Sequence, residues 1–188
     1  MTTSDAQSPA PPTACLAAIE ALPAVLLDQP LDYVFADHFR QRCVCGVLKA
    51  FAETGKASRI DAEAVIAYLD HDLRLHYRDE DEDLFPAIRK RAHLHDNLEK
   101  LLDQLSEDHR QAAPLSEAII HILATPSAVN PRNFETTERD IMLEYAKSEQ
   151  RHLSIENGIV LVIARKRLID ADLKSMSQSM KMRRGLPM

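Results

Sequence analysis

The stretch HYRDEDEDLFP, residues 76–86, decides the fold. It continues an apolar-periodic run, and it places His76 and Glu80 four residues apart on the face that this run must bury. At about 100° per residue, side chains at positions i and i+4 share one face of an α-helix. A second pair with this spacing, His152 and Glu156, lies in a later periodic run. The sequence therefore predicts two helices that each turn a histidine and a glutamate inwards.

Start and stop signals along the chain predict four long helices. Pro30 suits the first turn of a helix that ends at Gly55, and Ser58 suits the cap of the second helix. Pro86 is expected to kink or end the second helix, and Pro114 is expected to interrupt the third.

The remaining boundaries are weaker signals. The third helix is expected to open near Asp96 and the fourth near Phe134. A minor helix at residues 15–27 and a short terminal helix, capped by Asp170 and stopped by Gly185, complete the prediction. No strand alternation competes with the helical periodicity. We therefore expect an all-α fold, an up-down-up-down four-helix bundle with short N- and C-terminal extra helices.

Length and composition fit one such domain. We expect residues 1–14 to form a disordered Pro/Ser/Ala tail without secretory-signal character, and residues 15–185 to form the bundle. The formal charge of −6 argues against nucleic-acid and anionic-lipid partners, and no apolar run is long enough to span a membrane. The cysteines form no CxxC motif and indicate reduced thiols in a cytoplasmic protein; they are Cys15, Cys43 and Cys45.

Each of the four predicted helices has one histidine on the face that should be buried. The residues in question are His38, His76, His109 and His152. Burying four imidazoles and the carboxylates of Glu80 and Glu156 without partners costs about 1–3 kcal/mol per unsatisfied group, and far more for a lone charge. Bound cations would replace that cost with coordination.

The donors present match two metal ions. Each ion would take two imidazoles, and both ions would share the bridging carboxylates of Glu80 and Glu156. An oxo, hydroxo or water bridge would complete five-coordination and leave a position open for a small molecule. Imidazole with carboxylate suits iron, and also manganese or zinc.

Other polar residues near these positions have two interpretations each. Asp72, and Glu149 or Ser148, are candidate hydrogen-bond partners for the imidazoles, or solvated helix residues. Cys45 and Tyr145 either line the site or pack in the core, and packing is favoured. The acidic run at residues 79–83 is interpreted as a solvated face with Glu80 alone pointing inwards, rather than a cation-entry patch. The remaining histidines are assigned to the surface or to satisfied polar positions: His71, His93, His95 and His121.

The four histidine segments together resemble the hemerythrin-like (HHE cation-binding) domain. The motifs are DHFRQR at His38, HYRDEDEDLFP at His76, EDHR at His109 and HLSIENGI at His152, with a terminal MKMRRG at residues 180–185. The resemblance covers roughly residues 30–185. It implies a four-helix bundle around a non-haem di-iron centre, with the four histidines as ligands and with Glu80 and Glu156 as bridges.

The sequence departs from the oxygen-carrying hemerythrins on the third and fourth helices. In those proteins the third helix contains an H-x₃-H pair. In this sequence the residues four positions before and after His109 are Leu105 and Ala113. The fourth helix has His-x₃-Glu in place of His-x₄-Asp. This pattern favours the relatives that sense oxygen or iron, respond to nitric oxide or repair iron centres over the oxygen carriers.

Three classes of function remain open from the sequence. The first is a di-iron protein that binds oxygen, nitric oxide or peroxide for sensing, iron handling or stress response. The second is a di-iron enzyme with oxidase, peroxidase or nitric-oxide-reducing activity. The third is an interaction module whose bundle is merely stabilised by metal.

Overall fold

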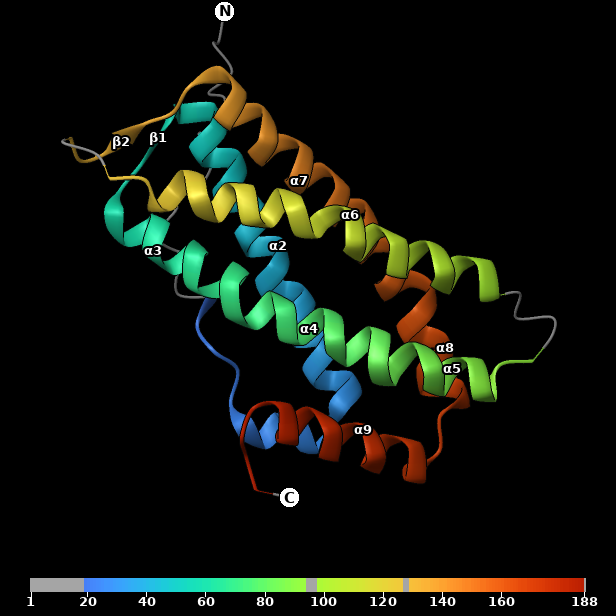
Figure 1. The fold of residues 1–188 in the computed structure, drawn as a ribbon. Helices are drawn as coiled ribbons and strands as arrows, with labels where there is room; N and C mark the ends of the chain where they lie inside the picture. The colour runs from blue at the N-terminus through green and yellow to red at the C-terminus, as the bar shows by residue number, and fades with distance from the viewer. Residues whose placement is uncertain (1–18, 94–97, 127–128, 188) are drawn as a thin grey trace, which may run out of the picture.

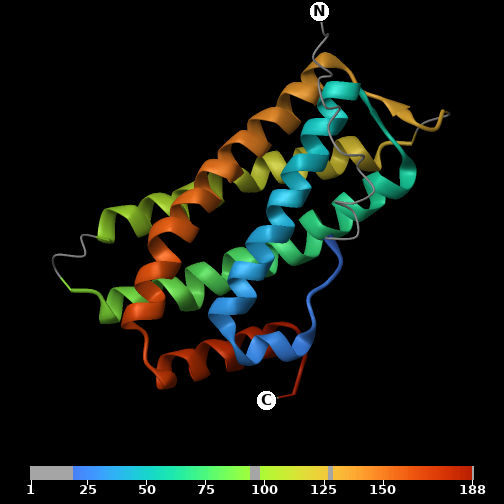
Figure 2. The same ribbon diagram turned by 180° about the vertical axis from the view of Figure 1, so that it is seen from behind.

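Four long helical segments run antiparallel to their neighbours along the molecule (Figures 1 and 2). A computed structural model describes residues 19–93, 98–126 and 129–187. The segments are α2 (Pro30–Thr54); α3 (Arg59–Ala67), η3 (Tyr68–Asp72), α4 (Leu73–Asp79), η4 (Glu80–Leu84) and α5 (Phe85–Arg91); α6 (Glu99–Ala124); and α7 (Thr136–Ile155), η6 (Glu156–Val160) and α8 (Leu161–Arg167). Within them α2 and α6 each pack along α7, and α3 packs along α6. The predicted all-α bundle is confirmed.

Short elements close the two ends of the bundle. A 3₁₀ turn, η2 (Ala24–Asp28), and helix α9 (Asp170–Arg183) pack together and against α2 at one end (Figure 1). At the other end two-residue strands, β1 (Lys56–Ala57) and β2 (Arg132–Asn133), pair antiparallel, which the sequence did not predict. The predicted tail at residues 1–14 lies outside the described residues, as does Asp96.

Several helix boundaries follow the predicted signals. Pro30 lies in the first turn of α2, and Gly55 ends that helix with a φ of 69°. The Ser58 hydroxyl accepts a hydrogen bond from the amide of Asp61 at 3.2 Å, so it caps α3. Gly185 has a φ of 66° after α9. Asp170 does not cap α9, because Ile169 is the cap residue and its amide donates to the Asp172 carboxylate at 3.2 Å.

Pro86 does not end the second helical segment, and Pro114 does not interrupt the third. The second segment continues through Pro86 to Arg91, directly after a π-helical turn in which the Phe85 amide donates to the Glu80 carbonyl. A π turn widens the helix by one residue, which accommodates the missing proline N–H. Helix α6 likewise continues through Pro114, because buried side chains on both sides, Ala112 and Ser116 among them, hold it against its neighbours.

The buried core consists of two apolar clusters. The first cluster includes Val44, Leu48, Leu69, Leu73, Ala112, Ile119 and Tyr145. The second cluster includes Val34, Leu84, Phe85, Leu105 and Val160. On every long segment, a histidine lies between the residues of the first cluster and those of the second. The core is therefore divided by one buried polar layer.

Helix α9 is attached to the polar layer through two arginines. The Arg184 guanidinium donates to Asp79 at 2.7 Å and lies 4.8 Å from the ring centre of Tyr33. Arg183 donates to the same carboxylate at 2.9 Å and also contacts Asp83. Asp79 is only 1% exposed and directly precedes Glu80. The two arginines therefore compensate a buried charge beside the candidate site.

Replacing Arg184 by glutamine should destabilise the metal-free protein by about 1–3 kcal/mol, because the buried Asp79 carboxylate loses a charged partner. Arg165→Gln is the matched control, since its pair with Asp32 at 2.8 Å is about half exposed on both sides and should contribute less than about 1 kcal/mol. Urea denaturation measures both. Equal small losses would show that Arg184 makes only a surface contact.

Candidate metal centre

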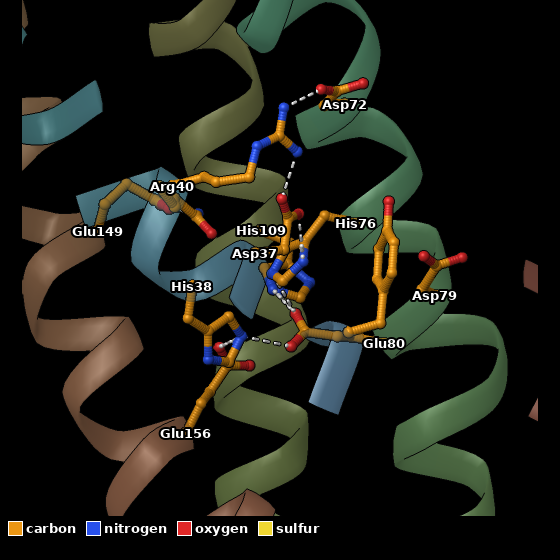
Figure 3. Close-up of polar contacts among 12 residues, drawn as sticks. Asp37, His38, Arg40, Asp72, His76, Asp79, Glu80, His109, Glu149 and Glu156 are labelled. Carbon is orange, nitrogen blue, oxygen red and sulfur yellow. Dashed lines mark hydrogen bonds and ion pairs between the residues drawn. The ribbon is translucent and has the colours of Figure 1, made fainter. Parts of the chain in front are cut away.

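The structure brings the six predicted side chains together inside the bundle. Their ligand atoms form two groups, each within a mutual distance of 4.8 Å, and none of the six residues is more than 4% exposed. The first group is His38, His76, Glu80 and Glu156; the second is Glu80, His109, His152 and Glu156. Figure 3 shows both carboxylates and the His38 ring turned toward one another. The two groups have both glutamates in common.

Each glutamate contacts imidazoles of both groups. Glu80 lies 3.1 Å from Nε2 of His38, 3.3 Å from Nε2 of His76 and 3.3 Å from Nε2 of His109. Glu156 lies 3.3 Å from Nε2 of His38 and 3.1 Å from Nε2 of His152. Both carboxylates thus occupy the position between the groups that a bridging ligand would take.

Both glutamates begin π-helical turns. Glu80 is the first residue of η4 and Glu156 the first residue of η6, and the amides of Phe85 and Leu161 donate to their carbonyls. Single π turns inside α-helices are frequent at functional sites. The His-x₃-Glu helices therefore have the same local geometry in both halves of the chain.

An outer ring of polar side chains faces the imidazoles, and three of its four members lie within hydrogen-bond distance. The Nδ1 atom of each histidine faces an acceptor from a neighbouring segment, and each acceptor directly precedes or follows one of the six residues. The pairs are Asp37 with His76 at 3.1 Å, Asp81 with His109 at 3.0 Å, Asp108 with His152 at 3.6 Å, and Asn157 with His38 at 3.0 Å. Donation from Nδ1–H leaves the Nε2 lone pair pointing inwards, as a metal ligand requires.

Buried atoms without hydrogen bonds provide a test of whether metal fits. Among the described residues, Nε2 of His76, Oε2 of Glu80 and both carboxylate oxygens of Glu156 are buried and lack a hydrogen-bond partner. Nε2 of His109 and Nε2 of His152 face each other at 3.0 Å. Adjacent ligands at right angles, each about 2.1 Å from one ion, lie about 3 Å apart. The residues present therefore fit two cations.

The pKa values of the site residues favour ionised carboxylates next to positive charge. Burial alone would raise the pKa of Glu80, but the adjacent imidazoles hold the pKa of that carboxyl well below its ordinary value. Burial opposes protonation of His109, yet its contacts with Asp81 and Glu80 raise its pKa to about 10. The pKa of His76 is raised in the same way, by Glu80 and Asp37. The protonated forms of His76 and His109 are therefore favoured beside the glutamates.

The raised pKa of His109 predicts opposite pH dependences for the metal-free and loaded forms. Its folded value of about 10 exceeds the unfolded value of about 6.5, so its contribution to stability is complete below about pH 6.5 and is lost as the pH rises toward 10. Metal must displace these protons, so metal affinity should rise over the same range. Thermal denaturation without metal and metal titrations at several pH values measure the two trends, and parallel trends would contradict the assignment.

The predicted outer partners were wrong. Asp72 accepts a hydrogen bond from Arg40, and Arg40 also donates to Asp37 at 2.6 Å. Asp72 is therefore linked to His76 only indirectly, through Arg40 and Asp37. Ser148 donates to the carbonyl of Tyr145 at 2.9 Å. Glu149 accepts from Gln41, and burial raises the pKa of its carboxyl.

The acidic run at residues 79–83 is not a solvated face with one inward residue. Asp79 is buried against Arg183 and Arg184, and Asp81 accepts from Ser106 at 2.6 Å besides facing His109. Only Glu82 fits the predicted role, since it is about half exposed; it pairs with the exposed Arg78 at 2.8 Å and with Arg183 at 3.1 Å.

The other candidate residues lie outside the two groups. Cys45 and Tyr145 are fully buried in the first core cluster, and burial raises the pKa of the Cys45 thiol. These two residues pack, as favoured from sequence. His71, His93 and His121 are exposed, and His95 lies outside the described residues.

The outer ring yields a prediction. Replacing Asp81 by asparagine should weaken metal binding by about 10–100-fold, because the His109 imidazole loses the carboxylate that orients it and strengthens it as a donor. Glu82→Gln changes the exposed neighbour and should leave affinity within about twofold. Competition titration with a chromophoric chelator measures both variants. Equal metal affinities in the two variants would show that Asp81 does not support metal binding.

Two adjacent groups of imidazoles and carboxylates, sharing both carboxylates inside a helical bundle, suggest a dinuclear metal site. The model of the hemerythrin HHE cation binding domain matches residues 29–164, and the chain belongs to this family. No curated protein matched the chain in a sequence comparison. Helix α9 and the two arginines at its end lie beyond the matched residues.

No helix among the described residues is long and apolar enough to cross a membrane.

Proposed function

We propose that the six side chains bind two iron ions, and that this non-haem di-iron centre binds a small ligand, oxygen, nitric oxide or peroxide, for sensing, iron handling or stress response. The observation that supports it most is the sharing of Glu80 and Glu156 by both groups. His38 and His76 would hold one ion, and His109 and His152 the other. Manganese or zinc fits the same donors. The cysteine pattern favours a cytoplasmic protein.

Four protein ligands per ion would leave coordination positions open. Bound iron supplies a redox-active Lewis acid at those positions. The chain's own residues would do three things: the outer ring orients the imidazoles of His38, His76 and His109, the two carboxylates would hold both ions, and the apolar clusters on either side exclude bulk water. These properties suit reversible binding or reduction of a small molecule.

Iron analysis and nitric oxide binding test this proposal together. Protein from iron-replete cells should contain about two irons per chain, and its absorption spectrum should change on adding nitric oxide. Two irons with a spectrum indifferent to nitric oxide, oxygen and peroxide would favour a metal-stabilised interaction module instead. Multiple turnovers of peroxide or nitric oxide, abolished in His76→Ala, would favour the enzyme.

A further inference from the structure

A surface pocket between α6 and α7 ends at His152, one of the six candidate ligands. Its volume is about 230 Å³, and its walls include Ala112, Pro114 and Leu115 from α6 and Ser148, Glu149 and His152 from α7. Figures 1 and 2 both show these two helices side by side. The pocket therefore connects solvent with a residue of the second ligand group.

The inner end of the pocket is polar and incompletely paired. His152 is 1% exposed, and its Nδ1 atom has no hydrogen-bond partner among the described residues, since Asp108 lies 3.6 Å away. Glu149, one helical turn before His152, is 2% exposed and accepts from Gln41. A molecule in this pocket would thus be separated from the metal positions by one imidazole ring.

The charges around the pocket select against anions. Asp108, Glu144 and Glu149 contribute three carboxyl groups, whereas Arg151 is the one cation among the residues that line it. Arg151 lies 3.3 Å from Asp108, so this pair is compensated. Glu144 at the exposed rim remains uncompensated, whereas burial raises the pKa of the Glu149 carboxyl at the inner end. An approaching anion would therefore be repelled at the rim.

We infer that neutral small molecules of two to four atoms, such as nitric oxide, dioxygen or hydrogen peroxide, reach the centre through this pocket, and that the Glu144 carboxylate at its rim slows the entry of anions. The inference rests on the proposed function, because it needs a loaded centre at which arrival can be observed. It goes further by assigning the route and the charge class of the ligand.

Stopped-flow association of nitric oxide and of azide with the iron-loaded full chain tests the route. Ser148→Phe fills the pocket, and Gln111→Trp narrows its exposed rim; each should slow both probes at least about tenfold at unchanged iron content. Ala124→Phe, in a different pocket at the end of α6, is the control and should change neither rate.

Glu144→Gln tests the charge selection at the rim. This substitution should raise the association rate of azide by about two- to threefold at low salt, and the effect should disappear in 1 M salt. The association rate of nitric oxide should stay unchanged. Rates of both probes within twofold of wild type in Ser148→Phe and Gln111→Trp would overturn the route while the proposed function stands. An unchanged azide rate in Glu144→Gln would overturn the selection. A wild-type chain that takes up no iron would overturn both proposals.

Discussion

Replacing Glu80 with alanine is expected to lower bound metal from about two ions per chain to well below one, and Glu156→Ala is expected to do the same. Each carboxylate belongs to both ligand groups, so its removal takes one donor from each ion. His76→Ala should behave differently, because His76 belongs to one group only, and about one ion should remain.

Elemental analysis after gel filtration measures this pattern. Glu82→Ala, two residues beyond Glu80 and exposed, is the matched control and should retain about two ions. The contrast between glutamate and histidine variants is what identifies a bridge. Full occupancy in both glutamate variants would exclude the bridging assignment, and a loss of one ion in every variant would indicate separate sites.

Removing the metal is expected to lower the melting temperature by roughly 10–20 °C. Each of the two ions, present at a hundredfold excess over its dissociation constant, adds about 2.7 kcal/mol to the stability. The melting temperature of a chain of this size shifts by about 2–4 °C per kcal/mol. Without metal, the buried oxygens of Glu156 have no hydrogen-bond partner among the described residues.

Calorimetry with and without a chelator measures this shift. Glu80→Ala serves as the control, because a variant that binds little metal should respond little to the chelator. A wild-type protein whose melting temperature changes by less than about 2 °C would contradict the proposal that two ions bind inside the folded bundle.

The helices and the six inward residues could be predicted because their signals are local. The i,i+4 spacing of His76 with Glu80 fixes a common helix face whatever the rest of the chain does. The capping residues Ser58 and Gly55 act within one or two turns, and both were predicted correctly.

The outer ring was missed because each of its members acts on a different segment. Asp37 lies in α2 but faces His76 on α4, and Asp81 lies in η4 but faces His109 on α6. A signal was present: each partner directly adjoins one of the six residues, as in Asp37-His38 and Asp108-His109. Asp72 shares a helical segment with His76 but contacts Arg40, whereas the partner of His76, Asp37, lies on another helix.

The π turns and the continuous helices at the prolines also depend on tertiary structure. Local propensity predicts a break at Pro114, but packing of α6 against α7 and α3 outweighs one lost hydrogen bond. The pairing of Arg183 and Arg184 with Asp79 spans about a hundred residues and has no local signal.

The most direct test of the account is an anomalous difference map, recorded at the iron edge, from crystals of the iron-loaded chain. We predict two peaks inside the bundle, one beside His38 and His76 and the other beside His109 and His152, with Glu80 and Glu156 between them. A single peak, or iron bound only at the protein surface, would contradict the account.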